Sequence, residues 1–281
     1  MLTRYVALVS EESSITPSEL TRVAAALQKQ AVRDFGPIWE IEATVDAFTK
    51  LEDVPLDYWP IIVKDDIGDP SAAGFHDDEQ GQPFSLVQFD RGWHLTASHE
   101  LVEMLADPFG RRMVAGESPV AGQGRVKFLV EVADPSEDAK FSYTINGIQV
   151  SDFYTPRYFD PVRANGVRYS YTGSITSPRQ VLKGGYLSWY VPATRKWWQR
   201  TWFSGNKPTD RTLAKLQVKN GNLRNAIDRQ TEAQRQKAQR SGSSGRSTAA
   251  ARKPTETPAS FTSRANDIRA AIAEAGRVAK G

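Results

Sequence analysis

The chain has 281 residues, of which 40% are hydrophobic and 10% aromatic, and this is enough to bury a substantial core. Its formal charge of +3 hides an asymmetry, because residues 206–281 hold 16 Lys/Arg against 6 Asp/Glu while the rest of the chain is acidic. The absence of cysteine excludes disulfides and thiolate chemistry, and no stretch is apolar over the length of a membrane span or a secretory signal. We therefore expect a soluble protein that is either cytoplasmic or associated with a virion or another assembly.

The N-terminal part alternates strand and helix signals. Residues 4–10 form a short β-rich run that is typical of a buried strand. Residues 16–19 (Thr-Pro-Ser-Glu) are a capping box, and apolar residues then recur at helical spacing, which predicts a helix that begins at Pro17. Residues 39–48 alternate apolar and polar side chains, as a half-buried strand does, and residues 59–64 are another predicted strand.

A polar stretch follows at residues 74–83 and is typical of a turn-rich loop that leads into an alternating strand at 84–89. His76 lies in this loop among acidic residues, where a solvated or locally hydrogen-bonded side chain is favoured over metal ligation. The order of strand, helix, three strands and a further helix predicts an α+β or α/β fold with helices on a mixed sheet.

That further helix spans about residues 96–107, with Thr96 or Ser98 as its N-cap and a proline just beyond its end. Helical spacing places His99, Glu103 and Asp107 along one stripe, while most of the remaining surface is apolar. A helix of this composition is buried, and its polar stripe needs a partner.

The segment His99-Glu100-x-x-Glu103 is similar to the zinc motif H-E-x-x-H with glutamate in place of the second histidine. Side chains at i and i+4 can reach one metal ion, and Zn²⁺ accepts both imidazole and carboxylate ligands. Glu100 then stands beside the site as a general base. The alternative is a polar stripe that is solvated or hydrogen-bonded within the protein.

A third ligand has to come from elsewhere in the chain. Asp107 is eight residues beyond His99, a rise of roughly 12 Å along a helix, so the two cannot share an ion. Asp107 is expected to end the helix or to bond a neighbouring loop. The nearest carboxylate-rich stretch is residues 130–138.

The segments after the site helix complete a globular domain. They are a strand at 125–132, a hairpin at Asn146-Gly147, a proline-punctuated aromatic loop at 151–161 and short strands near 186–203. The predicted boundaries are a domain at 1–204 (sheet and site helix in 1–110, strands and loops in 111–204), a basic flexible linker with a weak helix at 205–260, and an amphipathic C-terminal helix at 261–281. Such a tail either docks on a partner or remains solvated.

Four motifs follow one another in the region from Thr16 to Tyr190. They are Gly74-Phe75-His76-Asp77, Ala97-Ser98-His99-Glu100-x-x-Glu103-x-x-x-Asp107-Pro108, Glu131-Val132-x-Asp134-Pro135 and Val150-Ser151-Asp152-Phe153-x-x-Pro156-x-Tyr158-Phe159. With these motifs the region resembles a family of largely uncharacterised bacterial and phage proteins that look like zincin-type metallopeptidases. The tail lies outside the resemblance.

The resemblance implies a zincin-like α+β fold with a Zn²⁺ ion on the helix. It makes His99 and Glu103 ligands, Glu131 or Asp134 the third ligand and Glu100 the base, with Tyr154 or Tyr158 stabilising the oxyanion. In zincins an edge strand above the site helix takes up an extended substrate, and the Phe84 strand precedes the helix as that arrangement needs.

Two functions follow as expectations. The first is a zinc-dependent metallopeptidase or related hydrolase that acts on a peptide or protein. The alternative is a catalytically inactive zincin-like structural or binding protein, a component of a phage particle or another assembly, that docks through its basic tail. Nucleic-acid binding by the tail ranks last, because no aromatic residues are interleaved there for stacking. No membrane partner is expected.

Overall fold

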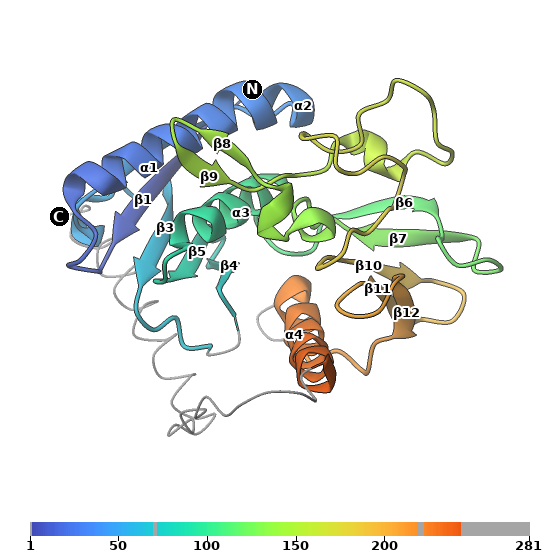
Figure 1. The fold of residues 1–281 in the computed structure, drawn as a ribbon. Coiled ribbons are helices and arrows are strands. Elements are labelled where there is room, and N and C mark those ends of the chain that lie inside the picture. The colour runs from blue at the N-terminus through green and yellow to red at the C-terminus, as the bar shows by residue number, and fades with distance from the viewer. Residues whose placement is uncertain (1, 70–71, 219–221, 243–281) are drawn as a thin grey trace.

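The structure is a computed structural model and describes residues 2–69, 72–218 and 222–242. This part of the chain contains two five-stranded sheets, a separate hairpin and helices packed on them (Figure 1). The predicted α+β class, with helices on a mixed sheet, is confirmed.

The first sheet has the order β2-β1-β3-β5-β4. Its strands are β1 (Arg4–Ser10), β2 (Ala43–Phe48), β3 (Tyr58–Lys64), β4 (Gly74–Glu79) and β5 (Gln82–Gln88). Strands β2, β1, β3 and β5 run parallel, whereas β4 is antiparallel to β5 and forms one edge, with β2 at the other.

The main core lies on one face of this sheet. The helices there are α1 (Pro17–Lys29), the π-helical turn η1 (Gln30–Phe35), α2 (Gly36–Trp39) and α3 (Trp93–Ala106). Leu8 of β1 shares a buried cluster with Leu27 of α1 and Leu101 of α3. Thr16 accepts a hydrogen bond from the amide of Glu19 at 3.2 Å, which confirms Thr16 as the N-cap of α1.

The second sheet is antiparallel throughout, with the order β12-β11-β10-β7-β6. Its strands are β6 (Met113–Glu117), β7 (Arg125–Leu129), β10 (Tyr186–Val191), β11 (Lys196–Thr201) and β12 (Thr209–Thr212). The hairpin of β8 (Tyr143–Ile145) and β9 (Ile148–Val150) turns at Asn146-Gly147, both at positive φ, as predicted. Short helical turns are η2 (Leu51–Asp53), η3 (Asp134–Ser136), η4 (Ala139–Phe141) and η5 (Pro156–Phe159).

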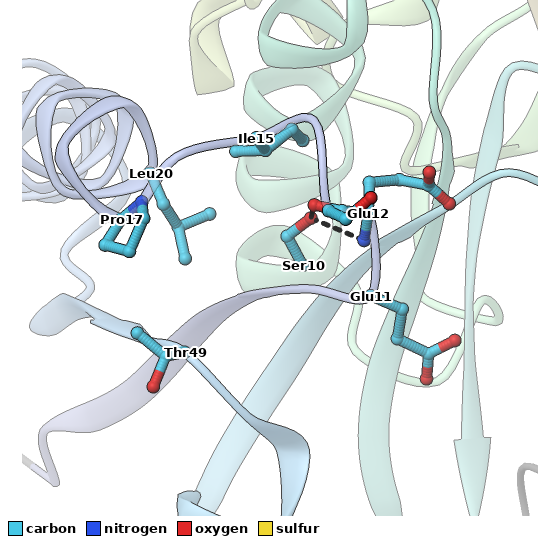
Figure 2. A pocket seen from close by; sticks show the side chains of 8 residues that line it. Ser10, Glu11, Glu12, Ile15, Pro17, Leu20 and Thr49 are labelled. Carbon is cyan, nitrogen blue, oxygen red and sulfur yellow. Dashed lines mark hydrogen bonds between the residues drawn. The ribbon is translucent and has the colours of Figure 1, made fainter.

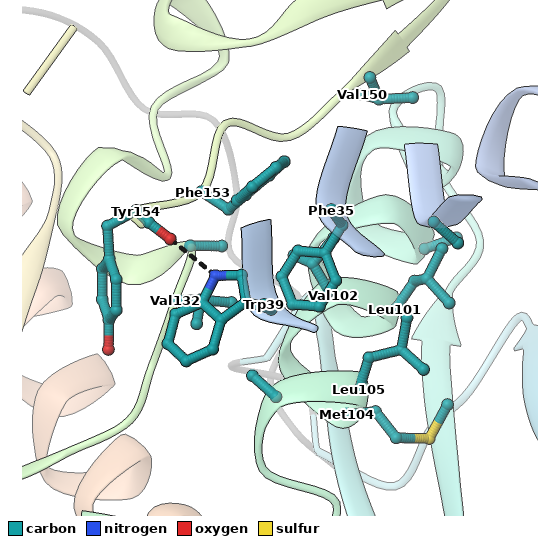
Figure 3. Close-up of a cluster of buried hydrophobic side chains, with 14 of the residues drawn as sticks. Phe35, Trp39, Leu101, Val102, Met104, Leu105, Val132, Val150, Phe153 and Tyr154 are labelled. Carbon is teal, nitrogen blue, oxygen red and sulfur yellow. Dashed lines mark hydrogen bonds between the residues drawn. The ribbon is translucent and has the colours of Figure 1, made fainter. Parts of the chain in front are cut away.

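Aromatic side chains join the two halves of the molecule, which are the first sheet with its helices and the part of the chain from β6 onward (Figure 3). Trp39 donates its indole N–H to the carbonyl of Tyr154 at 3.0 Å, and the rings of Phe35 and Phe153 lie 5.0 Å apart. Leu101 of α3 belongs to the same buried cluster. This packing holds α3 at a defined position relative to the segment that follows β7.

The chain beyond residue 204 contributes packed structure. β12 pairs with β11, and α4 (Leu223–Gly242) buries Ile227 against Leu129 and Leu213 beside the second sheet (Figure 1). The sequence predicts a basic linker with a weak helix here, because the segment of α4 carries few apolar side chains. Buried polar contacts hold it instead, such as the hydrogen bond from Gln199 to Thr231 at 2.6 Å. The C-terminal helix predicted at 261–281 lies outside the described residues.

Four local predictions are corrected. The segment predicted as a loop contains β4, because Gln80 and Gly81 at positive φ close a tight hairpin onto β5. The predicted edge strand, β5, is therefore interior and the polar β4 is an edge. Helix α3 begins at Trp93, before either predicted cap, and the strand predicted from residue 39 begins at Ala43. In the part of the chain that the structure describes, no helix combines the length and apolarity needed to cross a bilayer.

Candidate metal centre

Helix α3 presents His99 and Glu103 one turn apart on the same face. Nε2 of His99 lies 3.4 Å from Oε2 of Glu103, and their side chains are 15% and 1% exposed. The polar stripe predicted on this helix is thus buried and has partners. Asp107 ends the helix, and its Oδ2 accepts the amide of Arg112 at 2.6 Å, so it bonds a neighbouring loop as predicted.

Asp134 reaches the same place from the other half of the molecule. It opens the turn η3, and its Oδ1 lies 3.2 Å from Nε2 of His99. At this distance the two side chains can share a hydrogen bond in the metal-free protein. Ligands bound tetrahedrally to zinc at roughly 2.0–2.1 Å would lie about 3.3 Å from one another. The donor atoms of His99, Glu103 and Asp134 can therefore hold a metal ion.

A backbone contact fixes Glu103. Its Oε1 accepts a hydrogen bond from the amide of Ala133 at 3.1 Å, while Oε2 faces His99 and is ion-paired with Arg224. The carboxylate therefore ties α3 to the residue that precedes Asp134. Metal-binding carboxylates are commonly oriented in this way by a second hydrogen bond.

Glu100 points toward β4, where it meets His76. Nδ1 of His76 lies 3.3 Å from Oε2 of Glu100, and its Nε2 donates to the carbonyl of Asp107 at 2.9 Å. The structure corrects the prediction of a loop histidine, because His76 lies on a strand and is 1% exposed. A Cβ added at Gly74 would lie 2.7 Å from Thr96 Cγ2, so only glycine lets β4 approach α3 this closely. His76, Glu100 and Glu103 form a second buried group that can hold a metal ion.

Arg224 enters the same region from the start of α4. Its guanidinium is ion-paired with Glu103, contacts Nδ1 of His76 and lies 3.5 Å from Oε2 of Glu100, while the side chain is 4% exposed. Asn222 positions this end of the helix by donating to Asp77 Oδ1 at 2.9 Å. A fixed positive charge therefore stands among the acids of the site.

Glu131 and Asp228 extend the acidic cluster. Glu131 is 1% exposed, and neither of its carboxylate oxygens has a hydrogen-bond partner among the residues that the structure describes. Asp228, one turn beyond Arg224 on α4, accepts a hydrogen bond from the hydroxyl of Tyr186 at 2.8 Å. Glu131, Asp134 and Asp228 form a third group that can hold a metal ion.

The pKa values show how strongly these charges interact. Burial alone would lower the pKa of His99, but Glu103 and Asp134 raise it well above its usual value. Burial would raise the pKa of Glu100, but the charge of Arg224 and the hydrogen bond from His76 hold it below its usual value. Burial and the nearby Asp134 raise the pKa of Glu131 well above its usual range. The acids of the cluster therefore favour a positive charge at His99, and the carboxyl of Glu131 favours its neutral form.

The two tyrosines suggested for oxyanion stabilisation are fully buried. Tyr154 accepts the amide of Glu131 at 3.1 Å and so lies beside the cluster. Tyr158 donates its hydroxyl proton to the carbonyl of Gln180 at 3.0 Å and stacks on Tyr154 with ring centroids 4.3 Å apart. Of the pair, only Tyr154 lies next to the acidic groups.

Three residues of this region are not predicted from the sequence: Arg224, Asp228 and Tyr186. Arg224 and Asp228 stand i, i+4 on a basic helix, where such a pair is ordinarily a solvated ion pair. The signal available for His76 was the motif Gly74-Phe75-His76-Asp77, which the polar composition of the segment outweighed.

A separate pocket lies at the carboxyl ends of β1 and β2, beside the start of α1 (Figure 2). Ser10, Glu11, Ile15 and Thr49 are among its lining residues, and the Glu12 amide donates to Ser10 Oγ at 3.0 Å. None of the clustered residues on α3, η3 and α4 line it.

The chain was compared with protein-family models, curated proteins and solved structures, and none of them matches. The case for a function therefore depends on the geometry of the site.

Proposed function

We propose that the chain is a metal-dependent hydrolase of the zincin-like metallopeptidase type, with peptide or protein substrates and a divalent cation held by His99, Glu103 and Asp134. The observation that carries the proposal is the separation of the donor atoms, 3.4 and 3.2 Å from His99 Nε2, which matches the spacing of ligands around zinc. One imidazole and two carboxylates form a donor set that Zn²⁺ accepts.

The charge of the cluster supports a bound cation. Five buried or half-buried acids meet here: Glu100, Glu103, Glu131, Asp134 and Asp228. Arg224 contacts three of them, Glu100, Glu103 and Asp228. Burying unpaired carboxylates is costly, and a divalent cation offsets that cost. The orphaned oxygens of Glu131 are the clearest sign that the protein groups alone do not balance the site.

Glu100 is suited to act as the general base. A bound Zn²⁺ would polarise a scissile carbonyl and lower the pKa of the attacking water. Because the pKa of Glu100 is below its usual value, its carboxylate is ionised and can accept a proton from that water. His76 and Arg224 hold the carboxylate in place.

The edge strand supports a peptide as the substrate. β4 pairs only with β5 in the first sheet, and His76 of β4 contacts Glu100. An extended peptide can add to such an edge through main-chain hydrogen bonds. This would bring a scissile bond close to the site.

The test is hydrolysis of a mixture of fluorogenic peptides by zinc-loaded protein. We expect Glu100→Gln to lower the rate by about 10²–10⁴-fold while zinc content stays unchanged, because the ligands remain. Glu117→Gln, a partly exposed acid on β6, is the matched control and should retain full activity. Activity that persists in Glu100→Gln would contradict the assigned base.

One observation favours a second function, a catalytically inactive zincin-like scaffold. Arg224 is ion-paired with Glu103, so a guanidinium can take over part of the role of the metal. In that case the chain is a structural or binding protein, such as a phage or other assembly component, that docks through its basic tail. Wild-type protein would then bind no zinc, and removing residues 243–281 would abolish partner binding without changing the fold.

A further inference from the structure

Glu131 has no role in the centre formed by His99, Glu103 and Asp134. The residue lies two positions beyond the end of β7, and its backbone amide donates to the hydroxyl of Tyr154, which fixes where the side chain begins. Both carboxylate oxygens are buried, and no hydrogen-bond donor among the described residues reaches them. A carboxyl group in this position is either protonated or balanced by a positive group such as a cation.

Two further carboxylates face Glu131 from different elements. Asp134 comes from η3 and Asp228 from α4, and the three residues each offer an oxygen within 4.8 Å of the other two. No histidine belongs to this group. An all-oxygen donor set favours hard divalent cations such as Mg²⁺, Ca²⁺ and Mn²⁺ over zinc.

The two carboxylate oxygens of Asp134 face different groups. Its Oδ1 faces His99, whereas its buried Oδ2 has no hydrogen-bond partner in the described part of the chain. Tyr186 is close by, but its hydroxyl donates a hydrogen bond to Asp228 Oδ1 at 2.8 Å. A carboxylate arranged in this way can bridge two cations, as acidic residues do in two-metal hydrolases.

The arginines of α4 neutralise this group only in part, through the ion pair of Arg224 with Asp228. Arg224 is directed at Glu103, and its Nε lies 3.4 Å from Asp228 Oδ2. Arg235 is paired with Glu137 at 2.5 Å and with Glu232 at 3.2 Å. Neither guanidinium has an ion pair with Glu131 or Asp134 in these contacts.

We propose that Glu131, Asp134 and Asp228 form a second cation site, selective for Mg²⁺, Ca²⁺ or Mn²⁺, that shares Asp134 with the zinc centre. The claim that Asp134 is shared by two metal ions rests on the proposed function. The site formed by oxygen ligands alone can be tested by itself. Because Asp228 lies on α4, the second cation also fastens this helix to η3 and to the end of β7.

The experiment is a Mn²⁺ titration of full-length protein that carries one equivalent of Zn²⁺, followed by electron paramagnetic resonance. We expect wild type to bind one Mn²⁺ per chain. Glu131→Gln and Asp228→Asn should each weaken Mn²⁺ binding at least about tenfold, because each removes a charged ligand, while zinc stoichiometry is unchanged. Glu232→Gln, one turn beyond Asp228 on α4, is the matched control and should bind Mn²⁺ as wild type does.

The outcomes separate the two proposals. No Mn²⁺ bound by wild type, or equal affinity in all four proteins, would overturn the second site. Binding that is lost in His99→Ala and retained in Glu131→Gln and Asp228→Asn would also overturn it, because Mn²⁺ would then occupy the first site. Binding that depends on Glu131 and Asp228 in a protein that takes up no zinc would support the second site and contradict the proposed zinc hydrolase.

Discussion

Nε2 of His99 and Oδ1 of Asp134 lie 3.2 Å apart, although one side chain comes from α3 and the other from η3. The contact is buried, and Glu103 reinforces it by binding the amide of Ala133. The two halves of the molecule therefore meet through the groups that we propose as metal ligands. Metal binding and the packing of α3 on η3 should be coupled.

Asp134→Asn should weaken zinc binding at least about tenfold, since even the loss of an outer-sphere partner has that effect on metal sites. Calorimetric titration with Zn²⁺ would measure the affinity. Asp138→Asn is the control, because Asp138 pairs with the partly exposed Lys140 in the same loop. Equal zinc affinity in the two variants would remove Asp134 from the ligand set.

Arg224→Met should lower the free energy of unfolding of metal-free protein by about 3–5 kcal/mol, because it leaves buried carboxylates unpaired. Saturating zinc should recover part of this loss, since the metal neutralises the same acids. Urea unfolding with and without zinc would measure both effects. Arg229→Met, on the exposed side of α4, should change stability by no more than about 0.5 kcal/mol. A loss for Arg224→Met as small as that of the control would contradict the account.

Ser98→Ala should lower the free energy of unfolding by about 1–3 kcal/mol. The Ser98 hydroxyl donates to Gln30 at 2.7 Å and accepts the amide of Ser151 at 2.8 Å, so the change leaves two buried polar groups unpaired next to His99. Ser142→Ala, an exposed hydroxyl, is the control in the same urea experiment. Indistinguishable midpoints would show that this network does not support α3.

Asp34 gives a pH-dependent prediction. Burial would raise its pKa, but hydrogen bonds from Arg33, Tyr171 and Tyr143 hold the pKa below the usual 3.8. Because the folded-state pKa is the lower one, the stabilisation is complete above the unfolded-state pKa and is lost as pH falls through the folded-state pKa. The stability difference between wild type and Asp34→Asn should therefore be larger at pH 7 than at about pH 3 in urea unfolding. A difference that grows on acidification would contradict this sign.

Local sequence signals predicted much of the fold. The Thr16 N-cap, the Asn146-Gly147 turn and the polar stripe on α3 each depend on residues that are close in the chain. Helical spacing was also enough to bring His99 and Glu103 together. These are the cases in which covalent geometry alone sets the neighbours.

The rest of the site could not be predicted because its partners are distant in sequence and have no periodic pattern. Arg224 reaches Glu100 and Glu103 only because α4 packs beside the second sheet. His76 has the polar neighbours of a loop residue, yet it is buried because β4 pairs with β5 and lies against α3. In both cases tertiary packing overrode the local preference.

The most direct test of the proposed centre is the metal content of the purified full-length protein by elemental mass spectrometry, for wild type, His99→Ala and Glu103→Ala. The account predicts close to one zinc per chain in wild type after zinc is supplied, and little in either variant. Circular dichroism would check that both variants are folded. Wild type without bound zinc, or zinc that persists in both variants, would contradict a metal centre on α3.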